Sequence, residues 1–245
     1  MMPVIEAHDV AKAFRIPSVR RDTVREHFFG LFDRRRFETL QVLESISLQV
    51  GRGETLGIMG RNGSGKSTLL KILSGVYAAD RGQVTVRAPL TPILELGVGW
   101  NPDLDAIDNI LLLGTVMGLT LREVRGAIDS ILEFAGLARF ANLELKHYST
   151  GMASRLAYAV AFRAVREVLI LDEVFAVGDA EFKARCEARY RELRAAGHTV
   201  ILVSHDKRIV RAHCDRAVLL ERGVISMEGR PEEVVDAYLG LGAPA

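Results

Sequence analysis

The stretch GRNGSGKST, residues 60 to 68, has residue types and a spacing suited to binding phosphate. Glycines allow positive φ and let backbone N–H groups approach phosphate oxygens with no Cβ atom in the way. Lys66 adds a point charge for the β- and γ-phosphates, and the hydroxyl of Ser67 suits a bound Mg²⁺. The candidate contact residues in this loop are Gly60, Asn62, Gly63, Ser64, Gly65, Lys66, Ser67 and Thr68.

The neighbours of the glycine loop decide whether the match is functional. The apolar run at residues 55–59 predicts a buried strand, and residues 68–73 predict a helix. In this order the helix N-terminus directs its partial positive charge at the phosphates. A glycine-rich turn that contains a lysine by chance would explain the residues of the loop, but it would explain neither the strand before it nor the helix after it.

Polar residues also follow two other apolar strands. The strand predicted at residues 168–171 ends in Asp172 and Glu173, and the strand predicted at residues 199–203 ends near His205. Ligands of open α/β sheets bind at the carboxyl ends of the strands. Asp172 can hold Mg²⁺ through water, and Glu173 can polarise an attacking water molecule.

Two further candidates are weaker on their own. Ser149 precedes a predicted helix whose N-terminus, around Gly151, has free N–H groups for an anion, although a serine there is usually only a cap. Phe14 could stack on an adenine ring, which would contribute about 0.5 to 1.5 kcal/mol. An isolated phenylalanine is, however, more often a core residue.

Size and composition indicate an ordinary globular chain of 245 residues, as one large domain or a domain with a modest subdomain. The 32 Lys and Arg residues nearly cancel the 31 Asp and Glu residues, so no general basic field favours a nucleic-acid partner. Cys186 and Cys214 have no metal-like spacing and are expected to be reduced thiols. No signal-peptide core is present, nor a run of about 18 apolar residues that could span a membrane.

The remaining elements follow from apolar periodicity and turn signals. Further strands are predicted at residues 3–10, 42–50, 84–87, 92–96, 217–220 and 224–227, and further helices at 106–117, 121–135, 181–195 and 231–239.

An insertion between the first two strands has a pattern of its own. Its segment from Asp22 to Asp33 places Val24, Phe28, Leu31 and Phe32 on one helical stripe, with arginines on both sides. Such a helix suits contact with anionic lipid or with a membrane partner. Packing on its own domain, with the arginines in solvent, explains the pattern equally well.

Taken in order, GRNGSGKST, YSTGM, VLILDEVFAVGD and LVSHD resemble the nucleotide-binding subunit of ABC transporters over nearly the whole chain. The resemblance implies an α/β fold: a P-loop NTPase (RecA-like) core sheet with an antiparallel β subdomain and an α-helical signature subdomain. It also implies one nucleotide-binding domain at residues 1–240, with the insertion at about 18–38, the helical subdomain at about 103–165 and a tail at 241–245.

Roles follow from the resemblance residue by residue. They are catalysis for Lys66, Glu173 and His205; adenine stacking for Phe14; signature contacts for Ser149 and Gly151; the D-loop aspartate for Asp179; and metal binding for Ser67 and Asp172. Tyr148, Thr150 and Met152 depart from the commonest signature. The family's usual glutamine after the strand at 92–96 is missing, and Glu95 is the nearest candidate to replace it.

Within the family, LELGVGWNP, YSTGM and DEVFAVGDAEFK are most similar to ATPase subunits of O-antigen, capsule and teichoic-acid exporters. This similarity implies ATP and Mg²⁺ as cofactors, a homodimer, a membrane permease in two copies, and a peripheral position on the cytoplasmic face of the membrane. The alternatives are an ABC ATPase for another substrate, a non-transport ABC-type ATPase acting on ribosomes or DNA, and a small-molecule kinase that shares the glycine loop.

Overall fold

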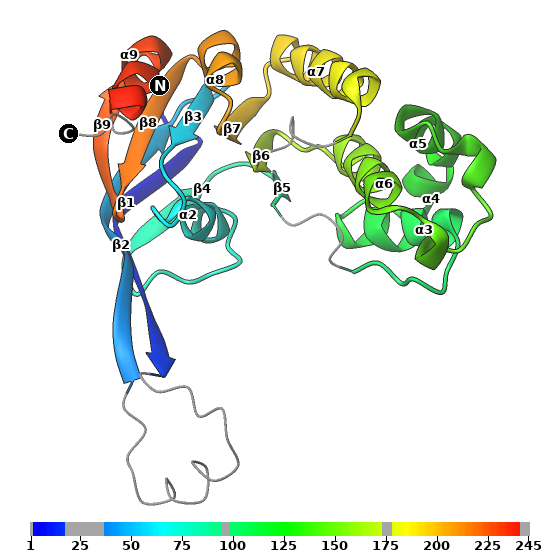
Figure 1. The fold of residues 1–245 in the computed structure, drawn as a ribbon, viewed down its shortest axis with the longest axis horizontal. Coiled ribbons are helices and arrows are strands. Elements are labelled where there is room, and N and C mark those ends of the chain that lie inside the picture. The colour runs from blue at the N-terminus through cyan, green and yellow to red at the C-terminus, as the bar shows by residue number, and fades with distance from the viewer. Residues whose placement is uncertain (1, 18–36, 95–98, 173–177, 241–245) are drawn as a thin grey trace, which may run out of the picture.

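The computed structural model describes residues 2–17, 37–94, 99–172 and 178–240. Figure 1 shows two β-sheets and the C-terminal helices at one end of the molecule and a group of helices, α3 to α6, at the other. Four of the predictions lie outside the described residues: the helix at residues 22–33, the metal contact of Glu95, the position of Glu173 and the tail at 241–245.

The larger sheet has six strands in the order β5-β6-β7-β3-β8-β9, and only the β8–β9 pair is antiparallel. Its strands are β3 (Thr55–Met59), β5 (Leu90–Ile93), β6 (Val168–Asp172), β7 (Thr199–Val203), β8 (Arg216–Glu221) and β9 (Val224–Gly229). The prediction of buried strands at 55–59, 168–171 and 199–203 is confirmed. Strands buried on both faces read as continuous apolar runs, which is why the sequence revealed them.

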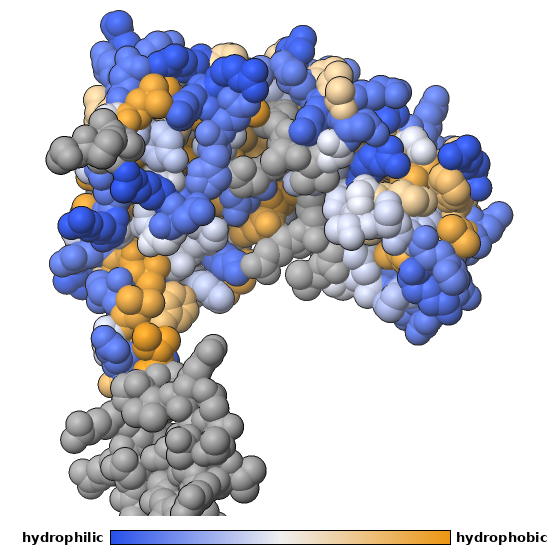
Figure 2. All heavy atoms as spheres, viewed as in Figure 1, coloured by the Kyte–Doolittle hydropathy of each residue, from blue (hydrophilic) through white to orange (hydrophobic). Residues whose placement is uncertain are grey.

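The smaller sheet is antiparallel, in the order β2-β1-β4, and consists of β1 (Ile5–Pro17), β2 (Phe37–Val50) and β4 (Arg81–Val86). The prediction that the first strand ends at residue 10 was wrong, because β1 continues through Phe14 by pairing with β2. The β1–β2 hairpin projects from the body of the molecule (Figure 1), and apolar side chains gather on it (Figure 2). Ile16, Phe37 and Leu40 are the exposed large apolar residues there.

The helices are α2 (Lys66–Leu73), α3 (Ala106–Val116), α4 (Leu121–Arg125), α5 (Ile128–Ala135), α6 (Thr150–Arg163), α7 (Ala180–Ala195), α8 (Lys207–His213) and α9 (Pro231–Gly240). The single helix predicted at 121–135 is in fact α4 and α5, because Gly126, a poor helix former, ends α4. Among the described residues, no helix has both the length and the apolar composition needed to cross a membrane.

Three hydrophobic clusters hold these elements together. The first lies between the two sheets and surrounds α2. The second covers the other face of the larger sheet with residues of α6, α7, α8 and α9, and the third fills the space among α3 to α6. The glycine loop is therefore held between β3, which belongs to the larger sheet, and α2, which packs in the first cluster.

Burial predicts that both cysteines are chemically inert in the folded protein. Cys186 and Cys214 are free thiols within the second cluster, and burial raises the pKa of each to about 12. Because the thiolate is the reactive species, we expect neither to react with Ellman's reagent at neutral pH until guanidinium unfolds the chain. A thiol that reacts rapidly in the native protein would contradict this prediction.

Candidate functional site

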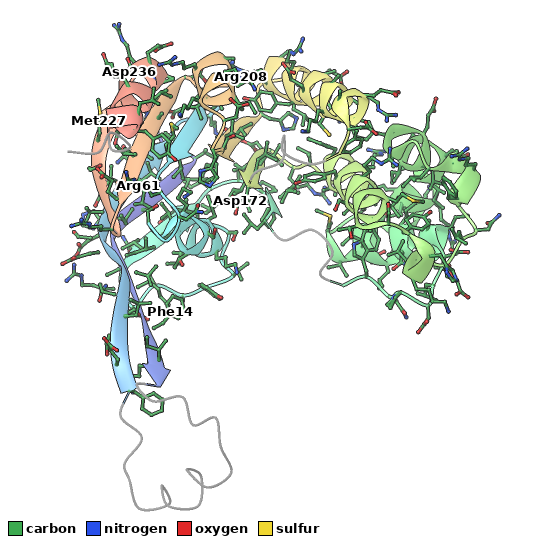
Figure 3. The ribbon with its side chains drawn as sticks, viewed as in Figure 1. Phe14, Arg61, Asp172, Arg208, Met227 and Asp236 are labelled. Carbon is green, nitrogen blue, oxygen red and sulfur yellow. The ribbon has the colours of Figure 1, made fainter. Side chains whose placement is uncertain are left out.

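A cavity of about 500 Å³ lies at the carboxyl ends of β3, β6 and β7. It brings together residues far apart in the sequence, as expected where parallel strands end at one edge of a sheet. Figure 3 shows Asp172 near β6 and Phe14 farther out on the projecting hairpin. The cavity is lined by Leu40, Val42, Asn62, Gly63, Gly65, Lys66, Ser67, Thr68, Asp172 and His205.

The glycine loop can take its shape only because two of its positions have no side chain. Gly65 has φ of 106°, and a Cβ atom there would lie 2.7 Å from Leu43 Cδ2 and 2.9 Å from the carbonyl oxygen of Val42. A Cβ atom on Gly60 would collide with the carbonyl oxygen of Leu220. The loop is thus fitted closely between β2 and β8, and its backbone is exposed toward the cavity.

Lys66 and the start of α2 supply positive charge at the same place. The side chain is largely buried, and Nζ donates to the carbonyl oxygens of Gly60 (2.7 Å) and Arg61 (2.9 Å). Gly65 is the N-cap of α2, and no side chain caps the helix. The first N–H groups of α2 and the Lys66 ammonium can therefore both be offered to an anion.

Ser67 and Asp172 place two side-chain oxygen atoms close together in the same cavity. Ser67 Oγ lies 3.5 Å from Asp172 Oδ2, with Ser67 in the first turn of α2 and Asp172 at the end of β6. Hydroxyl and carboxylate oxygens are hard donors of the kind that Mg²⁺ prefers. This pair of oxygen atoms fits a magnesium ion, which Ser67 and Asp172 would hold and which would neutralise phosphate charge.

The loop that follows β7 is held by its own hydrogen bonds. His205 lines the cavity, and the next residue, Asp206, caps α8 by accepting from the backbone N–H of Arg208 at 2.9 Å. The Arg208 guanidinium beside Asp206 lowers the pKa of that carboxyl group. The Asp206 N–H in turn donates to Ser204 Oγ at 3.1 Å. Sequence reasoning did not predict α8, although Asp206 is a favourable N-cap residue.

Several predicted site residues do not line this cavity. Ser149 caps α6 by accepting from the N–H of Met152 at 3.2 Å, and Gly151 lies in the first turn of that helix. Asp179 caps α7. Gly60 and Ser64 belong to the glycine loop, where the buried hydroxyl of Ser64 has no hydrogen-bond partner. Their assigned roles remain predictions.

The β1–β2 hairpin contributes Leu40 and Val42, which sequence reasoning missed. Phe14 pairs with Leu40 across the hairpin, but its ring stands edge-on to Tyr77 at 5.8 Å and lies under the Lys12 ammonium at 5.6 Å. Leu40 thus provides apolar surface beside the glycine loop. The stacking role of Phe14 stays a prediction. Leu40 could have been predicted as a cavity residue only from the pairing register of β1 and β2.

Comparison with known proteins is consistent with this site. The family described as "ABC transporter" matches residues 43–176, a stretch that contains the glycine loop, YSTGM and Asp172. The chain belongs to the ABC transporter family. Solved structures share the fold: the ATP-binding cassette MJ0796, solved as a dimer in a post-hydrolysis state with ADP and phosphate, has a TM-score of 0.74 at 22% identity. That alignment covers 93% of this chain and 98% of the cassette, and it confirms the predicted fold class.

Curated members of the ABC family match at higher identity. ABC transporter protein AbcA of Aeromonas salmonicida is 41% identical over 96% of this chain and 76% of its own length. The O-antigen export system ATP-binding protein RfbB of Klebsiella pneumoniae is 35% identical over 97% of this chain and 98% of its own. The teichoic acids export ATP-binding protein TagH of Lactiplantibacillus plantarum is 38% identical over 96% of this chain, which spans 64% of TagH.

Proposed function

We propose that this chain is the ATP-binding and ATP-hydrolysing subunit of an ABC transporter that exports a lipid-linked polysaccharide across the cytoplasmic membrane. The observation that carries the ATPase assignment is the cavity, which is lined by Lys66 at the start of α2, Asp172 at the end of β6 and His205 in the loop after β7. The names of the O-antigen and teichoic-acid relatives support the substrate class.

The residues of the cavity divide the work of phosphoryl transfer, which needs mainly positioning and charge stabilisation. The Lys66 ammonium and the N–H groups at the start of α2 bind the phosphates, and His205 contacts the γ-phosphate. Glu173 accepts a proton from the attacking water, as its place after Asp172 suggests. Mg²⁺, held by Ser67 and Asp172, would neutralise phosphate charge. Glu95 would provide a further ligand for this ion.

A second copy of the chain completes each site in this proposal. Ser149 and Gly151 lie outside the cavity that the glycine loop lines, so within one chain they do not share its nucleotide space. A head-to-tail pair of copies related by a two-fold axis would place the α6 N-terminus of one against the nucleotide of the other. Asp179 then lies at the seam between the copies.

The same proposal places the dimer on the cytoplasmic face of the membrane, bound to two copies of a permease. The permease would dock near Trp100, the only tryptophan in the sequence, which belongs to the LELGVGWNP stretch that resembles the exporter subunits. Residues 22–33 would contact the membrane surface, and no nucleic acid is needed. Residues 1–240 would form a single nucleotide-binding domain.

The test is ATP hydrolysis by the purified chain, alone and together with its membrane permease. We expect magnesium-dependent release of phosphate that rises when the permease is present in lipid vesicles. Transfer of phosphate to an acceptor other than water would support a kinase instead. Stimulation by nucleic acid, with no association with the permease, would support a non-transport ATPase.

The adenine contact gives a smaller prediction. Phe14→Ala should weaken ATP binding only several-fold, because one aromatic contact contributes about 0.5 to 1.5 kcal/mol. Leu40→Ala, which removes apolar surface within the cavity itself, is the matched comparison. Titration calorimetry with ATP measures both affinities. An ATP affinity that Phe14→Ala leaves unchanged would contradict the stacking role and show that Phe14 only packs against Tyr77.

A further inference from the structure

A second cavity, of about 270 Å³, lies between the glycine loop and the turn that joins β8 to β9. It shares Asn62 and Gly63 with the cavity at the ends of β3, β6 and β7, which we call the nucleotide cavity. Its other walls come from Arg61, Ser64 and residues 220–222, none of which lines the nucleotide cavity. Figure 3 labels Arg61 on the side of β8 and β9, and Asp172 on the side of β6.

Two arginines give the second cavity an excess of positive charge. Arg61 belongs to the glycine loop and Arg222 to the β8–β9 turn, and both are exposed. Within the described part of the chain, neither guanidinium group has a hydrogen-bond or ion-pair partner. Glu221 is the single acid among the described residues that line the cavity. One positive charge therefore remains for a ligand to neutralise.

A buried hydroxyl group lies in the wall of the same cavity. Ser64 is only 5% exposed, and its Oγ has no hydrogen-bond partner among the residues that the structure describes. A Cβ atom built on Gly60 would lie 2.6 Å from this oxygen and would collide with the carbonyl oxygen of Leu220, so the hydroxyl lies beside the end of β8. Buried polar groups are nearly always hydrogen-bonded. An oxygen atom of a ligand in this cavity would give the hydroxyl the partner it lacks.

The backbone around the second cavity is already fixed. The N–H of Gly223 donates to the carbonyl oxygen of Ser64 at 3.1 Å, and the carbonyl oxygen of Gly223 accepts from the N–H of Glu44 on β2 at 2.8 Å. These two bonds hold the β8–β9 turn against both the glycine loop and β2. A cavity whose walls are in place before binding loses less entropy when a ligand enters.

Arg222 has a backbone conformation that its residue type does not favour. Arg222 has φ of 48° and Gly223 has φ of 83°, and they are the two residues between the paired Glu221 and Val224. Two-residue hairpin turns with positive φ at both positions favour Asn-Gly or Asp-Gly. Residues in such sparsely populated conformations occur preferentially at functional sites. Here the unfavoured residue is the one that brings a guanidinium group to the cavity.

We propose that the second cavity binds a phosphate-class oxyanion between the guanidinium groups of Arg61 and Arg222. A guanidinium group offers paired N–H donors that match the oxygen atoms of phosphate. The Ser64 hydroxyl adds a donor from the buried wall, and the volume of about 270 Å³ leaves room for a phosphate ion. Binding at this site requires no hydrolysis, so the inference is independent of the proposed ATPase function.

Titration calorimetry with inorganic phosphate tests the site. The nucleotide cavity is first filled with magnesium and a non-hydrolysable ATP analogue, so that phosphate cannot enter it. We expect the wild-type chain to bind phosphate with a dissociation constant on the order of 1 mM, as suits a small anion. Arg61→Met and Arg222→Asn should each weaken this binding by roughly 10-fold or more, because each removes charge-assisted donors.

Arg222→Asn also separates ligand binding from structural support. Because asparagine suits the turn better than arginine, this variant should keep or raise the melting temperature while it loses phosphate binding. Arg230→Asn is the matched control, since Arg230 is an exposed arginine between β9 and α9 that does not line the second cavity. This control should bind phosphate as the wild-type chain does.

A free phosphate ion and the phosphate of a lipid headgroup share this chemistry, so vesicles that contain phosphatidic acid form a second arm of the test. Binding of inorganic phosphate that both Arg61→Met and Arg222→Asn weaken indicates a free anion. Binding of the vesicles alone, weakened by the same two variants, indicates a headgroup. The inference is overturned if neither probe shows binding that both variants weaken, or if Arg230→Asn weakens it equally.

Discussion

Glu173→Gln is expected to bind magnesium-ATP with near wild-type affinity but to hydrolyse it about 10²- to 10⁴-fold more slowly, the range for loss of a general base. The amide has the shape of the carboxylate but cannot accept the proton of the attacking water. Because hydrolysis normally removes the phosphate that holds the two copies together, the variant should also accumulate as an ATP-bound dimer. Phosphate release measures the first effect, and sedimentation with and without ATP measures the second.

Glu181→Gln is the matched control for this variant. Glu181 is an exposed acid in the first turn of α7, so the same isosteric change alters net charge equally without reaching the cavity. We expect wild-type turnover from it. Normal hydrolysis by Glu173→Gln would contradict the role of Glu173 as the general base. A Glu173→Gln chain that stays monomeric with saturating ATP, even beside the permease, would contradict the two-copy site.

Local signals in the sequence were enough to place the cavity. The glycine loop, its flanking strand and helix, and the acidic end of β6 each depend on a few consecutive residues, and parallel strands that carry them must end at one edge. The order of the motifs then indicated the family. Residues 60–68 and the ends of β6 and β7 were thus predictable without any knowledge of tertiary contacts.

The features that sequence reasoning missed depend on distant pairing. Leu40 reaches the cavity because β1 and β2 continue as a hairpin far beyond the strand lengths that local apolar patterns suggested. The second cavity brings Arg61 of the glycine loop together with Arg222 of the β8–β9 turn, and neither residue type indicates the other. Gly126 shows the opposite case, since a single poor helix former marks the break between α4 and α5, but the sequence analysis followed the apolar period around it and predicted one helix.

Lys66→Ala is expected to abolish the stabilisation of the chain by ATP and to reduce turnover by about 10²- to 10³-fold, the usual effect of removing one donor that stabilises charge in the transition state. The reason lies in the apposition of Lys66 Nζ to the loop carbonyls of Gly60 and Arg61, from which it can turn to the phosphates. A ligand at 100 times its dissociation constant stabilises a protein by about 2.7 kcal/mol. Thermal unfolding with and without magnesium-ATP therefore reports binding directly.

Lys71→Ala provides the matched control, because Lys71 lies on the same helix, carries the same charge and does not line the cavity. Its ammonium lies over the ring of Tyr77, 5.4 Å from the ring centre. We expect Lys71→Ala to keep the full ATP-dependent rise in melting temperature, whereas Lys66→Ala loses it. Equal loss in both would show that overall positive charge on α2, rather than the position of Lys66 in the glycine loop, binds the phosphates. Equal retention would mean that the loop backbone and the α2 N-terminus suffice for binding, and the lysine would then act only in the transition state.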